Sequence, residues 1–371
     1  MVMKELDAIK EQSRKKIELV GEYVDNWLYV VENAKMVNKN EIIFIDCMCN
    51  SGIYKNNDKG TAIVVLERFI KHAKEHYGIK YELHLNDNDK EKIIFLKNVI
   101  KNIERPSNVF VYYSNEDVNV YLDSLKKTTK FGKAFTLIFV DPFNFGTVDI
   151  NRFCSLLNVT YCEILFNFFT SDIRRNIHNE HAPNKMQKIK ASLSDFMSTN
   201  YTNDRECLNC FIQSLKKCRY IKYTFSIEFR NKNNQNLYYL VYATPNINGL
   251  NKLKESIWKV FKGAPYHINK KDDKKLSLFD LDESKQMLEE YYLSNYLPDV
   301  IEDCRLKFKN SIFTYDDIQE FIMEETMLKS GQIIKHVIKP SLKNGMLTYD
   351  SKSGKSFKKS TYKWEGLDVC K

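Results

Sequence analysis

The chain has 371 residues, 43% of them hydrophobic, so it exceeds the usual size of one domain and can bury a full core. Its 57 lysines and arginines against 48 acids give a net charge of +9, which favours a polyanionic partner over an acidic one. Residues 1–14 lack the apolar core of a signal peptide, and no apolar stretch approaches the ~20 residues of a membrane span. We therefore expect a soluble, cytoplasmic protein with one large domain and one smaller one.

Neither the cysteines nor the histidines form a recognisable metal-binding pattern. Cys207 and Cys210 make one CxxC pair without a second pair at zinc spacing, and scattered thiols are typical of reduced, cytosolic proteins. His178 and His181 could share a helix face, but Pro183 follows at once and no third ligand is specified. We interpret both pairs as incidental and expect no metal site.

The chain begins with a predicted helix, a buried strand, a short loop and a second helix. Residues 4–37 carry apolar side chains along one helical face, with Lys15 and Lys16 off that face. The next apolar run stops at Asp46, and a turn-forming loop then leads to an amphipathic helix over residues 61–77. In such an α/β unit the ligand lies beyond the carboxyl end of the strand, where loop N–H groups and a helix N-terminus meet it.

The loop after this strand is the candidate cofactor cradle. It holds one glycine where the dinucleotide-binding fingerprint has three, so a strand, turn and helix without a ligand is the alternative. The residues that we expect to contact a cofactor in this segment are Asp46, Cys47, Cys49, Asn50, Ser51 and Gly52.

The next two predicted strands also end in polar residues. Residues 81–87 end at Asp87, whose carboxylate could accept hydrogen bonds from both ribose hydroxyls, with Asp89 as the second choice. The strand after it leads to Asn115 and Asp117, which could bind the edge of a base or cap the following helix. These side chains extend the expected cofactor site.

The remaining strands of the first domain change direction. Two further strands, at residues 135–140 and 163–169, alternate with a short helix, which predicts a parallel doubly wound sheet. A polar, helical insertion is expected at 170–218, and two long β runs at 220–230 and 237–243 predict a hairpin. A parallel α/β sheet closed by an antiparallel hairpin is typical of class I methyltransferases, whereas dinucleotide-binding Rossmann folds stay parallel.

The C-terminal segment predicts a winged helix. Two helices separated by a short turn are followed by a strand, a basic tip at 351–356 and a strand over 357–364. We therefore expect a methyltransferase domain at 1–265, a linker and connecting helix at 266–307, and a winged-helix domain at 308–371.

Positive charge is concentrated in this last domain. Nine lysines and a single acid, Asp350, lie between Met327 and Lys363, which is the electrostatic footprint of a duplex binder, although many winged helices contact proteins instead. The residues that we expect to contact phosphates are Lys335, Lys339, Lys343, Lys355, Lys358 and Lys359.

The fourth strand ends in the candidate catalytic motif. An exocyclic base amine is a poor nucleophile, and a carboxylate at this position could accept its N–H bonds while an aromatic ring stacks the unstacked base. Asp141 would be the acceptor, Pro142 would fix the turn, and Phe143 and Phe145 would be the stacking platform. The alternative is that Asp141 caps the following turn and both phenylalanines belong to the core.

These motifs resemble those of the three-Cys-motif partner (TcmP) proteins, a family of methyltransferase-like proteins. The segments that carry the similarity are residues 44–52, 139–143, 163–168, 238–244 and 257–260, within a span of roughly residues 15–262. The resemblance implies an S-adenosylmethionine (SAM)-dependent methyltransferase fold acting on nucleic acid beside a radical-SAM-like partner protein. The C-terminal segment is similar to the winged helix of some members.

One position departs from the family. Where its members usually have an alanine–glycine pair, this chain has Cys49 and Asn50. Asparagine is the non-glycine residue that best tolerates a positive φ, so the turn can survive. The side chain of Asn50 could also crowd the carboxyl-bearing tail of the cofactor. A catalytically degenerate protein that binds DNA or scaffolds a partner is then the alternative function.

Overall fold

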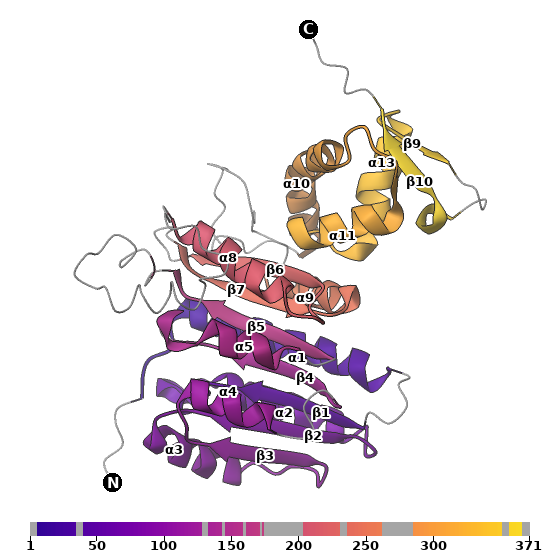
Figure 1. Cartoon of the computed structure of the whole chain (residues 1–371). Coiled ribbons are helices and arrows are strands. Elements are labelled where there is room, and N and C mark those ends of the chain that lie inside the picture. Colours follow the sequence, from indigo (N-terminus) through magenta and orange to yellow (C-terminus); the bar gives the residue numbers. More distant parts are fainter. Residues whose placement is uncertain are drawn as a thin grey trace. The chain divides into compact units, whose positions relative to one another are not determined.

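The structure is a computed structural model, and it describes residues 6–34, 40–127, 133–142, 145–158, 161–170, 173, 203–230, 236–261, 285–350 and 356–365. Contacts divide the chain into two compact units, Met1–Gly249 and Leu250–Lys371. Each unit has a sheet of its own (Figure 1).

The first unit contains a seven-stranded sheet with the order β3-β2-β1-β4-β5-β7-β6. The first five strands are parallel, and β7 pairs antiparallel with both β5 and β6. The order reverses between β1 and β4, and ligands of open α/β sheets bind beyond the carboxyl ends of the strands at such a switch point. The strands are β1 (Glu41–Asp46), β2 (Lys80–Asn86), β3 (Val109–Ser114), β4 (Phe135–Val140), β5 (Cys162–Phe168), β6 (Tyr223–Arg230) and β7 (Asn236–Thr244).

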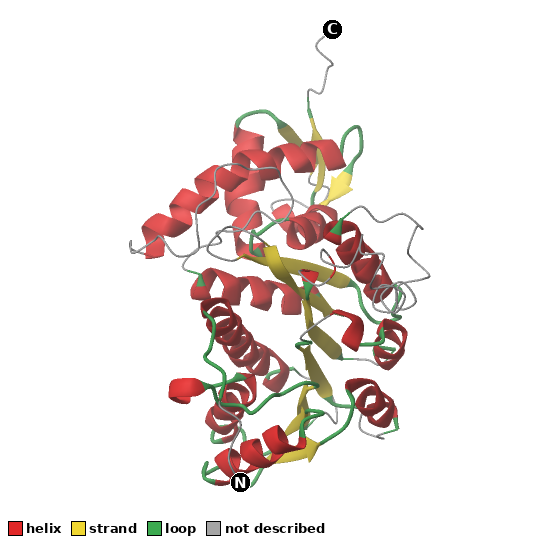
Figure 2. Cartoon of the chain, turned by 90° about the vertical axis from the view of Figure 1, so that its left-hand side faces the viewer, coloured by secondary structure: helices red, strands yellow, loops and turns green. Residues whose placement is uncertain are grey.

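Helices cover both faces of this sheet (Figure 2). On one face, apolar side chains of α4, α5 and α8 form a core with alternate strand residues such as Ile43, Ile45 and Ile138. On the other face α1 packs against α2, and the hydroxyl of Tyr23 donates to the buried carboxylate of Glu163 on β5. The helices are α1 (Glu11–Glu32), α2 (Thr61–Ala73), α3 (Lys90–Lys101), α4 (Val118–Lys126), α5 (Ile150–Leu156) and α8 (Asp204–Lys216).

Several helix ends differ from the prediction. The first helix begins at Glu11 and ends at Glu32, and α2 ends at Ala73, four residues before the predicted limit at Tyr77. Lys16 is buried, although we placed it off the apolar face, because its ammonium pairs with the carboxylate of Asp141, which follows β4. Most of the predicted insertion, including His178 and His181, lies outside the described residues.

The second unit combines helices with a three-stranded antiparallel sheet of order β8-β10-β9. Its segment Phe357–Lys359 is a helical turn, so the strand that we predicted from residue 357 begins at Thr361. The elements are α9 (Ile247–Val260), α10 (Lys285–Lys307), β8 (Phe313–Thr314), α11 (Tyr315–Glu325), a helix with three segments (α12 Ser330–Gln332, η3 Ile333–Ile338 and α13 Lys339–Lys343), β9 (Leu347–Asp350) and β10 (Thr361–Trp364).

Most of α9 belongs to the second unit, whereas we predicted the domain boundary at residue 265. The reason is a set of buried polar contacts. The ammonium of Lys254 donates to the carbonyls of Ile322, Thr326 and Leu328, and the indole of Trp258 donates to the carbonyl of Met327. Within the described parts of the chain, no helix has the length and apolar character of a membrane span.

Candidate functional site

The loop after β1 contains two residues with a positive φ. Asn50 has a φ of 56° and Gly52 a φ of 72°, so Asn50 adopts the positive φ that we expected it to tolerate. A Cβ atom on Gly52 would lie 2.3 Å from Cδ1 of Leu96 on α3, so the buried leucine side chain would have to move, in addition to the strain of the positive φ. The N–H of Cys49 donates to the carbonyl of Asn86 at 2.8 Å. The loop is therefore held closely against β2 and α3.

Asp87 follows β2 directly and joins two loops. It is buried, and its Oδ2 accepts from the N–H of Asn50 at 2.9 Å while its Oδ1 accepts from the N–H of Asp89 at 2.9 Å. A carboxylate oxygen can accept more than one hydrogen bond, so Asp87 keeps capacity for a ligand. Asp89, our second choice, caps α3 by accepting from the N–H groups of Glu91 and Lys92.

The polar residues after β3 have structural partners. The amide of Asn115 donates to the carbonyl of Asp87 at 2.8 Å, and Asp117 caps α4 by accepting from the N–H of Asn119. Asn86, which we did not predict, donates to the carbonyls of Cys47 and Glu116 and accepts from the N–H of Glu116. An amide at the end of a buried strand was the available signal, because such a group needs several partners.

A cavity of about 190 Å³ opens beside these loops. Of the predicted residues it brings together Cys47, Asp87 and Asp117, but its lining includes neither Asp46 nor Asp141. The lining residues are Cys47, Met48, Asn86, Asp87, Asn88, Glu116, Asp117, Val118 and Thr147.

Asp46, the last residue of β1, is 1% exposed. Burial raises its pKa to about 8, with a further contribution from the negative charges of Asp141 and Asp87, although the N–H of Met48 and the ammonium of Lys16 oppose the shift. Burial, together with the negative charges of Asp141 and Asp46, also raises the pKa of Tyr54 to about 12. The carboxylates of Asp87 and Asp141, which follow the two strands that flank β1, therefore both act on Asp46 at the switch point.

Asp141 follows β4 and has two partners from other elements. Its Oδ2 lies 2.5 Å from the ammonium of Lys16 on α1, and its Oδ1 accepts from the amide of Asn167 on β5 at 2.6 Å. The side chain of Asp141 is 29% exposed and that of Lys16 is 7% exposed. Among the described residues the carbonyl oxygen of the Asn167 amide has no hydrogen-bond partner, although it is buried. Sequence reasoning missed both partners.

The other predicted catalytic residues are only partly described. Pro142 is buried, whereas Phe143 lies outside the described residues. The backbone of Phe145 begins the helical turn Phe145–Thr147, which precedes α5. The proposed aromatic platform therefore stays a prediction.

The lysines of the second unit lie on an exposed surface. Lys335, Lys339 and Lys343 follow one another at intervals of four residues along one helix and are all exposed. The ammonium of Lys339 lies 5.7 Å from the centre of the Phe357 ring, which precedes the exposed Lys358 and Lys359. Lys355 lies outside the described residues.

No protein-family model matches the sequence, and a search of curated proteins finds no match either. Solved structures match with low TM-scores and low sequence identity. A presumed O-methyltransferase from Klebsiella pneumoniae is 10% identical with a TM-score of 0.34 over 60% of this chain and 79% of that chain. A SAM-dependent methyltransferase from Methanosarcina mazei is 11% identical with a TM-score of 0.31 over 58% and 96%. A geranyl diphosphate methyltransferase in complex with SAM is 11% identical with a TM-score of 0.31 over 65% and 97%. With scores this low, the chain's own residues must carry any functional conclusion.

Proposed function

We propose that the first unit is a SAM-dependent methyltransferase whose site lies at the switch point between β1 and β4. The observation that carries the proposal is the set Asp46, Asp87 and Asp141, which lie at the carboxyl ends of β1 and of the two strands that flank it, β2 and β4. Burial keeps Asp46 largely protonated near neutral pH in the free protein, and a positively charged ligand beside it would lower its pKa again and pair with the ionised carboxylate. SAM carries a cationic sulfur and a cationic amine.

The residues around the cavity fit the rest of this cofactor. Asp87 can accept from ribose hydroxyls, because each of its carboxylate oxygens accepts from one backbone N–H and has a further lone pair. Asn50 does not block the loop, since its side-chain oxygen accepts from the N–H of Ser51 at 2.9 Å and so belongs to the turn itself. We infer that Asp46 pairs with the amine and that the cavity beside Asp117 receives the nucleoside.

The proposed chemistry is transfer of a methyl group to a nucleobase amine. Bound SAM would supply the electrophilic methyl group. Asp141 would orient the amine by accepting one of its N–H bonds, while Lys16 and Asn167 hold the carboxylate in place. The amine proton would then leave to solvent. Phe143 and Phe145 remain the proposed stacking residues.

A second candidate follows from the Lys16–Asp141 ion pair. Its 2.5 Å separation places a cation beside the position where the amine would gain positive charge, and this opposes the reaction. In this alternative the protein keeps the methyltransferase fold without catalysing transfer, and it binds nucleic acid or scaffolds a radical-SAM-like three-Cys-motif partner.

We also propose that the second unit is a winged helix that binds nucleic acid. The element order α10, β8, α11, the segmented helix, β9 and β10 supports this reading. Exposed Lys335, Lys339 and Lys343 would contact phosphates together with Lys358 and Lys359, which lie in the β9–β10 connection.

The deciding experiment measures transfer of a radiolabelled methyl group to mixed DNA and RNA. Calorimetry with S-adenosylhomocysteine is done in parallel for the wild type, Asp141→Ala and the surface control Asp123→Ala. We expect labelling that Asp141→Ala abolishes, with cofactor binding retained and the control unchanged. Labelling that survives in Asp141→Ala would remove its catalytic role. Cofactor binding without any labelling by the wild type would favour the second candidate.

A further inference from the structure

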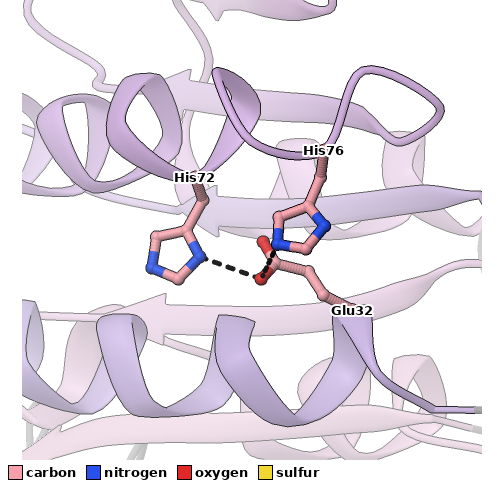
Figure 3. Close-up of side chains that lie close together, drawn as sticks. All are labelled: Glu32, His72 and His76. Atoms are coloured by element: carbon pink, nitrogen blue, oxygen red, sulfur yellow. Dashed lines mark hydrogen bonds and ion pairs between the residues drawn. The ribbon is translucent and has the colours of Figure 1, made fainter.

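A separate polar cluster joins the C-terminal ends of α1 and α2 (Figure 3). It consists of Glu32, His72 and His76, whose ligand atoms all lie within 4.8 Å of one another. Lys16 and Glu32 are on the same helix 16 residues apart, which places Glu32 roughly 24 Å along the axis from the Asp141 ion pair. The cluster is therefore outside the site proposed above.

The two imidazoles converge on one carboxylate oxygen. Nδ1 of His72 lies 2.9 Å and Nε2 of His76 lies 3.3 Å from Oε2 of Glu32. The N–H of His76 donates to the carbonyl of His72 at 3.1 Å, so the backbone makes one more helical turn after α2 and presents both rings on one side. Such separations between donor atoms suit a single ion bound among them.

Each donor is oriented by a second group. The hydroxyl of Tyr81 donates to Oε1 of Glu32 at 2.6 Å, and Nε2 of His72 lies 3.1 Å from Oδ1 of Asp25. The turn that carries His76 is fixed by the amide of Asn108, which donates to the carbonyls of Ala73, His76 and Ile79. A metal-bound histidine typically donates its other ring N–H to a carboxylate, which is the arrangement of His72 and Asp25.

We propose that Glu32, His72 and His76 bind a divalent transition-metal ion of the zinc type. Two imidazoles and one carboxylate are a known ligand set for zinc, and a water molecule would complete the tetrahedron. The side chain of Glu32 is 1% exposed and that of His76 is 33% exposed, so the open position faces solvent on the His76 side. The ion would cross-link the C-terminal end of α1 to the C-terminal end of α2.

The competing arrangement holds a proton in place of the metal. In that case His72 is an imidazolium that donates to both Glu32 and Asp25. Lys71 and Arg68 also lie beside Asp25, at 3.0 Å and 4.0 Å, so that carboxylate has cationic partners with or without the metal. The proton-bridged cluster needs no third donor, whereas the metal needs His76.

The test is titration of Zn²⁺ into tag-free, chelator-treated protein, followed by calorimetry and by the visible spectrum of the Co²⁺ form. His76→Ala is compared with the control His84→Ala, because His84 also contacts a carboxylate, Glu82, at 3.0 Å. We expect one equivalent of Zn²⁺ in the wild type and in the control. Binding in His76→Ala should be more than about 100-fold weaker, since even outer partners contribute roughly 10–100-fold.

Two further measurements keep the test decisive. Asp25→Asn should weaken Zn²⁺ binding by roughly 10–100-fold, and Zn²⁺ should raise the Tm of the wild type but not that of His76→Ala. If His76→Ala is misfolded by circular dichroism, His76→Gln takes its place. Equal Zn²⁺ affinity in the wild type and the His76 variant would overturn the proposal and leave the proton-bridged cluster. None of these readouts depends on methyl transfer.

Discussion

Lys254 offers a test of what holds the second unit together. Its side chain is fully buried, and its ammonium donates to the carbonyls of Ile322, Thr326 and Leu328 at 3.2, 2.7 and 3.0 Å. Burial lowers the pKa of Lys254 well below its ordinary value. The three acceptors nonetheless match the three N–H bonds of an ammonium, so we expect it to be charged in the folded unit.

The change Lys254→Met shortens the side chain by the terminal nitrogen alone and so removes its donors. The carbonyl of Ile322 still accepts from the N–H and the hydroxyl of Thr326, so the loss falls on the carbonyls of Thr326 and Leu328. Each buried carbonyl that loses its partner lowers the free energy of unfolding by about 1–3 kcal/mol. Removal of the buried charge offsets part of this loss, because the ammonium no longer has to be desolvated. We expect a net loss of roughly 2–4 kcal/mol and a fall in Tm of roughly 10 °C.

The assay is urea unfolding followed by tryptophan fluorescence in a Trp27→Phe background. The two remaining tryptophans, Trp258 and Trp364, both lie in the second unit and are buried. The matched control is Lys252→Met, which removes only a partly exposed ion pair with Glu255 and should cost about 0.5 kcal/mol or less. Equal unfolding midpoints for the two variants would refute the reasoning.

Three more outcomes are expected. Because burial raises the pKa of Asp46 to about 8, the stability that its protonation contributes is fully present below pH ~4 and is lost progressively as the pH rises from about 4 to 8. Asp46→Asn should therefore remove a pH dependence of about 1.4 kcal/mol per pH unit in this range, as measured by unfolding at several pH values. Gly52→Ala should destabilise the first unit by about 1–3 kcal/mol in urea unfolding, because of its positive φ and the contact with Leu96, and an unchanged midpoint would contradict the loop geometry. Lys343→Ala should lower by about one unit the slope of log binding constant against log salt concentration for nucleic acid, measured by fluorescence titration with Lys307→Ala as the control. Equal slopes for the two variants would favour protein binding as the role of the second unit.

The strands, and the edge of the sheet that holds the candidate site, were predictable because their signals are local. An apolar run that stops at an acid specifies both a buried strand and the position of Asp46, and the same pattern recurs before Asp141. The alternation of strands and helices then predicts that these acids share one edge of a parallel sheet.

The partners of these acids were not predictable, because they come from distant parts of the chain. Lys16 precedes Asp141 by 125 residues, and a lysine beside an apolar helical face is ordinarily assigned to solvent. Glu32 precedes His72 by 40 residues, so only the His72–His76 spacing of four was visible, and we passed over it. The helical turn at Phe357–Lys359 was hidden for another reason, since alternating aromatic and polar residues also fit a strand.

The grouping of acids at the switch point has a consequence for turnover, if the proposed function is correct. Asp87 and Asp141, joined by Asp46 when a bound cation ionises it, make a region of negative potential, of which Lys16 compensates only a part. Methyl transfer converts a sulfonium into a neutral thioether, so the cofactor loses one positive charge where that potential acts. The spent cofactor should therefore leave more readily than the methyl donor, and weak product inhibition would accompany the transfer.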